Sequence, residues 1–205
     1  MLPGIDTPIG RFQLTCSAVS GEPQCSVAEG GARVWAWSRA DLDAEVWVGR
    51  VEPALPEGMA VSDCYAAIWR VRAKRALSGC EFICMHEGER VIGAGDACSG
   101  QGLEAQEWSG NGYTVTVGTQ TIEAMIAHRR KGGSFPLRLA RDPQILDAFE
   151  VALVEYLPYG FVVRPPALQQ GEMIQVQFVV AWVPEKSDST ASWFAVNYTP
   201  PGGRG

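Results

Sequence analysis

Residues 78–98, SGCEFICMHEGERVIGAGDAC, hold three of the six cysteines and one of the two histidines of the chain. On an extended strand, side chains two residues apart point to the same side, so Cys80, Phe82, Cys84 and His86 would share one face. Thiols and an imidazole on one face raise two kinds of chemistry, a metal site and a cysteine nucleophile activated by a histidine.

The strand spacing argues against a metal site. Side chains four residues apart on a strand are separated by about 13 Å, whereas each thiolate on a zinc ion lies about 2.3 Å from it. Only Cys84 and His86 are close enough to act together, and they remain the candidate catalytic pair of a thiol- or metal-dependent enzyme. We expect ordinary buried thiols, no metal and no other cofactor.

Six cysteines in 205 residues are too few for a disulfide-stapled scaffold, so reduced thiols are the expected state. A hairpin turning at Glu87 and Gly88 would place Cys80 opposite Gly95. Cys98 would then lie near the base of that hairpin. A disulfide between Cys80 and Cys98 is therefore a separate hypothesis.

Two other motifs in the chain are incomplete. Glycines recur over residues 93–102, but Cys98 stands where a dinucleotide-binding loop needs its third glycine, and no clear helix follows. Residues 41–45 begin like a calcium loop, yet Val46 occupies the position of its required glycine. Both stretches are better explained as turns.

The net charge of −6 and the pI near 5.0 disfavour attraction to phosphate backbones or anionic lipid. The basic residues of 70–75 are interpreted as a solvated face or a protein contact. No stretch is typical of a signal peptide or long enough to span a bilayer. We expect a protein made in the cytoplasm that could join a particle, with neither nucleic acid nor membrane as its partner.

Alternating apolar residues predict strands over residues 10–17, 33–38, 45–51 and 62–77. A loop is expected at 21–31, and a proline-rich break at 52–58. Trp35, Trp37 and Trp47 fall within the second and third of these strands. Any of them left exposed would be an anchor for a protein interface.

The second half of the chain mixes strands and helices. A long glycine-rich loop is expected at 95–112, then a strand from Tyr113 and a helix over 120–131. A second helix is predicted from an N-cap at Asp142 to Tyr156. Strands are expected at 161–164 and 173–183, with a last strand at 193–198 pairing back against them.

These elements predict an α+β fold, a mostly antiparallel sheet system with two helices in the C-terminal half. We expect one domain over 1–205, with a mainly β sub-region at 1–95 and an α+β sub-region at 112–205 joined by the loop 95–112.

Because complete catalytic motifs are lacking and tryptophan-rich strands are abundant, we expect a non-catalytic structural or interaction protein. It would be a subunit of a multi-chain assembly, for example a phage-type virion or tail component, that binds a protein partner or itself. The alternatives are an intracellular inhibitor or immunity-type protein binding a basic partner, and an enzyme using Cys84 and His86.

Overall fold

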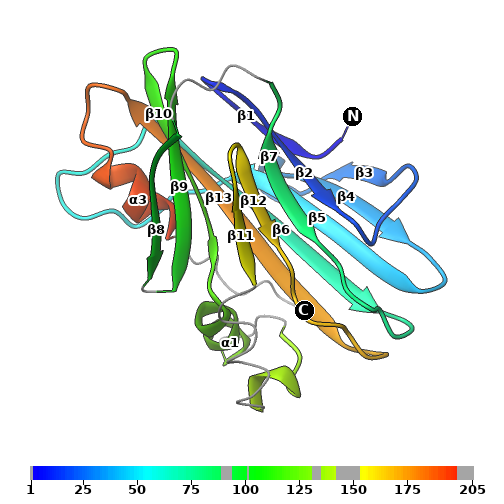
Figure 1. Cartoon of the computed structure of the whole chain (residues 1–205). Coiled ribbons are helices and arrows are strands. Elements are labelled where there is room, and N and C mark those ends of the chain that lie inside the picture. The colour runs from blue at the N-terminus through cyan, green and yellow to red at the C-terminus, as the bar shows by residue number, and fades with distance from the viewer. Residues whose placement is uncertain (1, 89–93, 101, 131–134, 142–152, 198–205) are drawn as a thin grey trace.

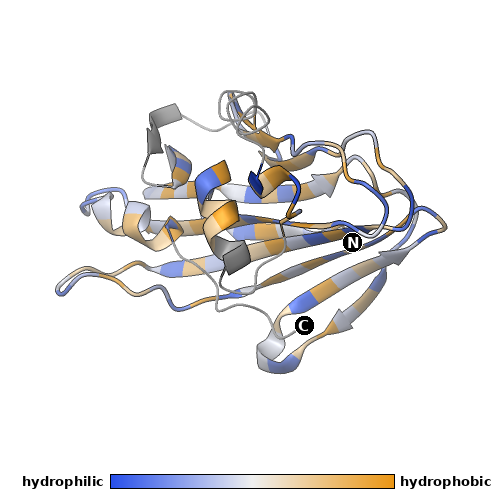
Figure 2. Cartoon of the chain, turned by 90° about the horizontal axis from the view of Figure 1, so that it is seen from below, coloured by the Kyte–Doolittle hydropathy of each residue, from blue (hydrophilic) through white to orange (hydrophobic). Residues whose placement is uncertain are grey.

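The computed structural model describes residues 2–88, 94–100, 102–130, 135–141 and 153–197, with the backbone alone for 94–100 and 128–130. Within these residues the chain forms two antiparallel sheets that lie one on the other (Figure 1). The view from below shows the layers edge-on, with apolar and polar residues alternating along the strands (Figure 2).

The smaller sheet has the strand order β1-β2-β7-β12-β11. Its strands are β1 (Gly4–Thr7), β2 (Gly10–Cys16), β7 (Phe82–His86), β12 (Gly160–Val163) and β11 (Val154–Leu157). Residues from the first and last thirds of the chain are therefore joined in one sheet, with β7 between them.

The larger sheet has the strand order β3-β4-β5-β6-β13-β10-β9-β8. Its strands are β3 (Gln24–Val27), β4 (Arg33–Ser38), β5 (Leu42–Arg50), β6 (Asp63–Ala73), β13 (Met173–Pro184), β10 (Tyr113–Gln120), β9 (Leu103–Gly110) and β8 (Ala94–Gly100). Both sheets thus combine strands from the two expected sub-regions.

The main core lies between the sheets, where the alternating apolar residues of both inner faces meet. Trp69 of β6 is fully buried, stacks on Trp37 at a centroid distance of 5.7 Å and contacts Phe82 of the smaller sheet at 5.9 Å. Trp108 of β9 likewise contacts Phe12 at 5.6 Å and Phe161 at 6.2 Å. Tryptophans therefore join the two layers.

A second, smaller cluster covers part of the outer face of the larger sheet. Helix α3 (Thr190–Val196) packs there against β13 and β10. A Cβ atom added to Gly118 would stand 2.9 Å from the Val196 side chain, so glycine lets the helix approach the sheet closely. The proline-rich residues 52–58 extend over the same face, with Leu55 packed against the cluster.

Most of the predicted strands are confirmed. The predictions at 10–17, 33–38, 45–51, 62–77, 161–164 and 173–183 correspond to β2, β4, β5, β6, β12 and β13. The helix expected at 120–131 is α1 (Ile122–Arg130), with Ile122 and Met125 buried. Short 3-10 turns occupy Glu29–Gly31 and Leu139–Arg141.

Four predictions about secondary structure are wrong. The loop expected at 21–31 contains strand β3. The loop expected at 95–112 contains β8 and β9, which turn at Gly102 with a φ of 83°. The strand expected at 193–198 is occupied by helix α3, because the Asp188 carboxylate accepts hydrogen bonds from the Thr190 backbone and hydroxyl and so favours a helix start. The helix expected from Asp142 lies mostly outside the described residues, but its predicted last turn is strand β11.

The fold is therefore mainly β, and the α+β class is correct only in its antiparallel sheets and two helices. Among the described residues, none of the helices is long and apolar enough to cross a membrane.

Candidate functional site

The inner face of β7 is arranged as its spacing predicts. Cys80, Phe82, Cys84 and His86 are all buried, with exposed fractions of 3%, 0%, 0% and 8%. The second strand of the expected hairpin, residues 89–93, lies outside the described residues. Strand β7 lies between β2 and β12 at the centre of the smaller sheet.

The surroundings of Cys84 and His86 do not favour catalysis. Burial raises the pKa of the Cys84 thiol, which disfavours the reactive thiolate. His86 Nε2 lies 3.0 Å from the Ile9 carbonyl oxygen, Nδ1 lies 3.4 Å from that of Gly88, and the ring contacts Phe12 edge-on. In the described part of the chain, hydrogen bonds link His86 to the backbone and not to Cys84.

A disulfide between Cys80 and Cys98 stays a prediction, since the side chain of Cys98 lies outside the described residues. In the structure Cys80 is a free thiol. Its neighbour is Cys16 at the end of β2, with which it shares a hydrogen bond. The backbone of Cys98 belongs to β8, in the other sheet, opposite Ala105.

No group of three or more histidine, cysteine, aspartate or glutamate side chains among the described residues is placed to hold a metal ion.

The three tryptophans proposed as interface anchors have different positions. Trp35 and Trp37 are buried, with exposed fractions of 3% and 8%, and the Trp37 indole donates a hydrogen bond to the Gly21 carbonyl. Trp47 points to the outer face and packs half-buried against the second cluster. Trp35 also lines an open groove, described next, and Trp37 lines a second, smaller one.

A groove of about 540 Å³ opens beside β3, at one edge of the larger sheet. Leu2 and Val27 are exposed in it, at 55% and 72%, and Cys25 is exposed beside them. Its lining residues are Leu2, Gly21, Glu22, Pro23, Cys25, Val27, Arg33 and Trp35. The groove is therefore mainly apolar, with one charge of each sign.

All four residues of β3 are exposed, and β3 is the terminal strand of its sheet. The Ala28 amide donates to the Ala32 carbonyl, so the backbone groups of Ala28 point toward the chain that continues into β4. Because backbone groups alternate in direction along a strand, those of Ser26, two residues earlier, also point toward β4. The amides and carbonyls of Cys25 and Val27 consequently point outward from the edge. The sequence predicts a loop over 21–31 instead of this strand, because four residues are too few to show a reliable alternation.

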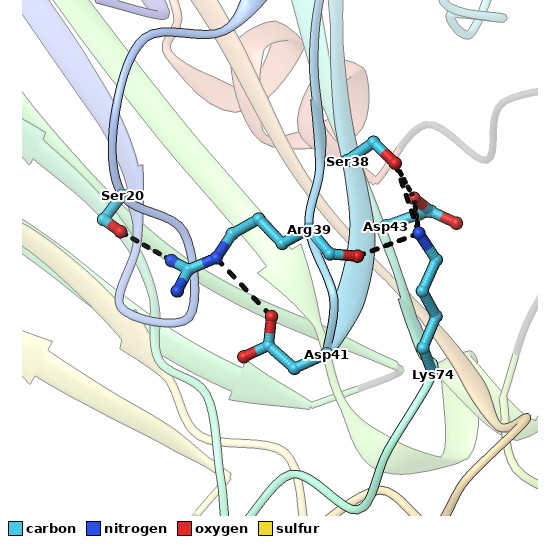
Figure 3. Close-up of polar contacts among 6 residues, drawn as sticks. All are labelled: Ser20, Ser38, Arg39, Asp41, Asp43 and Lys74. Atoms are coloured by element: carbon cyan, nitrogen blue, oxygen red, sulfur yellow. Dashed lines mark hydrogen bonds and ion pairs between the residues drawn. The ribbon is translucent and has the colours of Figure 1, made fainter.

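The outer face of the larger sheet carries paired charges. Lys74 donates to the Asp43 carboxylate at 2.5 Å and to the Arg39 carbonyl at 3.0 Å, and Arg39 lies 3.5 Å from Asp41 (Figure 3). The hydrogen bond from Lys74 lowers the pKa of Asp43. Arg70 pairs with Glu45 at 3.2 Å in a neighbouring groove of about 280 Å³. These carboxylates are already paired within the chain.

Comparisons with known proteins add little to this geometry. No protein-family model matches the chain, and no curated protein matches its sequence. One solved structure, described as "Putative kojibiose phosphorylase from human microbiome", overlaps with a TM-score of 0.47 and 6% sequence identity. The overlap covers 95% of this chain but 27% of that one, so the chain spans about a quarter of that protein's length. A likeness of this size carries no conclusion about activity.

Proposed function

We propose that the chain is a non-catalytic structural protein that assembles with further copies of itself through the edge of β3. The observation that carries the proposal is the open edge, in which Cys25 and Val27 direct backbone groups outward beside an apolar groove. The multi-chain assembly would be of the kind predicted from the sequence, such as a virion or tail component.

Apart from the shortness of the strand, the β3 edge lacks the features that normally prevent pairing between sheets. Its sequence, QCSV, contains no charged residue and no proline, and among the described residues no further strand covers it in the sheet order. Lysines, prolines and bulges are the usual protection of exposed edges. An unprotected edge is a template for another strand.

A second copy fits this edge because the edge is self-complementary. If two β3 strands pair antiparallel about a two-fold axis at Ser26, Cys25 of one copy lies opposite Val27 of the other, and the reverse. The outward groups of both residues then form four hydrogen bonds. Apolar side chains meet apolar side chains on the groove side, and the two larger sheets become continuous.

The expected affinity of one such contact is low. Four hydrogen bonds contribute about 1 kcal/mol each, and full burial of each Val27 side chain adds about 1.5 to 3 kcal/mol. Association costs at least about 4 kcal/mol. The balance, about 3 to 6 kcal/mol, corresponds to dissociation constants between about 40 μM and 6 mM, which suits a subunit that is held by several contacts at once.

Sedimentation velocity over a wide concentration range, in reducing buffer, tests the proposal. Val27→Pro removes one outward amide without touching the bonds to β4, whereas Val27→Ile keeps both the amide and an apolar β-branched side chain and is the matched control. We expect the wild type and Val27→Ile to associate as concentration rises, and Val27→Pro to remain monomeric. A wild type that stays monomeric at millimolar concentration, or Val27→Pro associating like the wild type, would refute the proposal.

A further inference from the structure

Cys16 and Cys80 lie side by side at one end of the smaller sheet. Cys16 is the last residue of β2 and lies opposite Phe82 in the register of β2 with β7. Beyond it, the Ser17 amide donates to the Glu81 carbonyl at 2.9 Å, and the Glu81 amide donates to the Ser17 hydroxyl at 2.8 Å. Continuing this register places Cys80, two residues before Phe82, diagonally across from Cys16 on the same face of the sheet.

Both thiols point into the main core, with exposed fractions of 4% and 3%, and both are free. A hydrogen bond from the Cys80 thiol lowers the pKa of Cys16. The same interaction, together with burial, raises the pKa of Cys80. Within the pair, Cys16 is thus the sulfur that more readily becomes a thiolate, and Cys80 is the proton donor.

The other described cysteines differ from this pair. Burial raises the pKa of Cys84, and burial raises that of Cys64 to about 12, so both are inert thiols without a neighbouring cysteine in the described residues. Cys25 is exposed on β3 and lies away from the core. Reactivity toward a second thiol of the same chain is therefore concentrated at Cys16 and Cys80.

We propose that Cys16 and Cys80 are a disulfide-forming oxidation site that responds to peroxides. The Cys16 thiolate attacks one oxygen of hydrogen peroxide and becomes a sulfenic acid, while the second oxygen leaves as hydroxide and takes up a proton to form water. The Cys80 sulfur, on losing its proton, then displaces the hydroxyl of the sulfenic acid as a second water molecule. Two thiols are oxidised by two electrons, and one peroxide is reduced to two waters.

The backbone around the pair leaves room for the bond to close. A disulfide requires a sulfur separation of about 2.05 Å, so the hydrogen-bonded sulfurs must move closer. Gly79 precedes Cys80, is exposed, and has no atom within 4 Å of the position where a Cβ would stand. Ser17, on the other side, is bonded to the Glu81 backbone through its amide and its hydroxyl, so we expect the movement at Gly79.

The test uses the full chain carrying Cys25→Ser, which removes the exposed thiol that could cross-link two molecules. The folded protein is treated with hydrogen peroxide, its remaining thiols are alkylated under denaturing conditions, and peptides are mapped without reduction. We expect a peptide pair linked through Cys16 and Cys80, loss of two alkylatable thiols per chain, and a higher melting temperature that reducing agent reverses.

Variants separate this site from general oxidation. In Cys80→Ser, Cys16 should be trapped by a sulfenic acid reagent and no linked pair should form. In the matched control Cys84→Ser, which removes a buried thiol from the same face of β7, the Cys16 to Cys80 link should form as before. Linkage through other cysteines, or full alkylation of Cys16 and Cys80 after treatment of the parent protein, would overturn the proposal.

Discussion

Replacement of Trp69 by phenylalanine should leave the stability of the protein nearly unchanged, although Trp69 is fully buried at the centre of the core. Its indole Nε1 is buried and has no hydrogen-bond partner among the described residues. The smaller ring loses packing contacts with Trp37 and Phe82, worth about 1 to 2 kcal/mol. Removal of an unsatisfied buried N–H group stabilises the folded protein by about 1 to 3 kcal/mol.

Trp108→Phe is the matched comparison, because it makes the same chemical change at an equally buried position. The Trp108 indole donates a hydrogen bond of 3.1 Å to the Pro158 carbonyl. Its removal loses similar packing and also this hydrogen bond, worth about 1 kcal/mol because Pro158 is exposed and water can replace the donor, for a total of about 2 to 3 kcal/mol. The two variants should therefore differ by about 2 kcal/mol or more.

Thermal unfolding followed by far-ultraviolet circular dichroism measures the difference. For a chain of this length, about 2 kcal/mol corresponds to a gap of roughly 4 to 8 °C in melting temperature. Urea unfolding provides an independent free energy of unfolding for the same three proteins. If Trp69→Phe destabilises the protein as much as Trp108→Phe, the buried indole N–H carries no penalty and the reasoning fails.

Two other changes test the packing and the electrostatics. Glu172 accepts two hydrogen bonds from Arg138, and these lower the pKa of Glu172 in the folded protein. The stabilisation from this ion pair is therefore fully present above the pKa of about 4.3 that a glutamate has in the unfolded chain. It is lost as the pH falls through the lower pKa of the folded state. With the Arg138 side chain one-third exposed, Glu172→Gln should cost about 1 kcal/mol at neutral pH, and the difference from wild type should vanish in acid. Glu185→Gln, the same substitution at an exposed position, should leave the stability at neutral pH unchanged. A Cβ on Gly160 would stand 2.1 Å from the Cys84 carbonyl oxygen, so Gly160→Ala should cost at least about 2 kcal/mol by separating β12 from β7. Gly110→Ala, whose nearest neighbour is 3.5 Å away, should melt within a degree or two of wild type.

The sequence predicts correctly those strands whose two faces differ strongly in polarity. Along β13, Ile174, Val176, Phe178 and Val180 alternate with glutamines at 175 and 177, and all four apolar side chains are buried as expected. The face shared by Cys80, Phe82, Cys84 and His86 is confirmed for the same reason. Period-two alternation is a local property, so it needs no knowledge of which strands become neighbours.

The wrong predictions share a different cause, since each depended on neighbours that are distant in the sequence. Strand β9 falls within the loop predicted at 95–112, because its residues are mostly polar and show no apolar alternation. It becomes part of the sheet by pairing with β10. The apolar residues of 193–196 resemble a strand, but the outer face of the larger sheet receives them as a helix, against small residues such as Gly118. Tertiary packing decides such ambiguous segments.

The candidate site changes for the same reason. The prediction of a disulfide between Cys80 and Cys98 uses local spacing alone, whereas the pairing of β2 with β7 brings Cys16, distant in the sequence, next to Cys80. Trp35 and Trp37 were expected as interface anchors if they were exposed, and the packing of the two sheets buries both rings. The aromatic residues that seemed suited to binding a partner are used within the core. The contact proposed here therefore depends on the outward backbone of β3, at Cys25 and Val27, which carries no distinctive side-chain signal in the sequence.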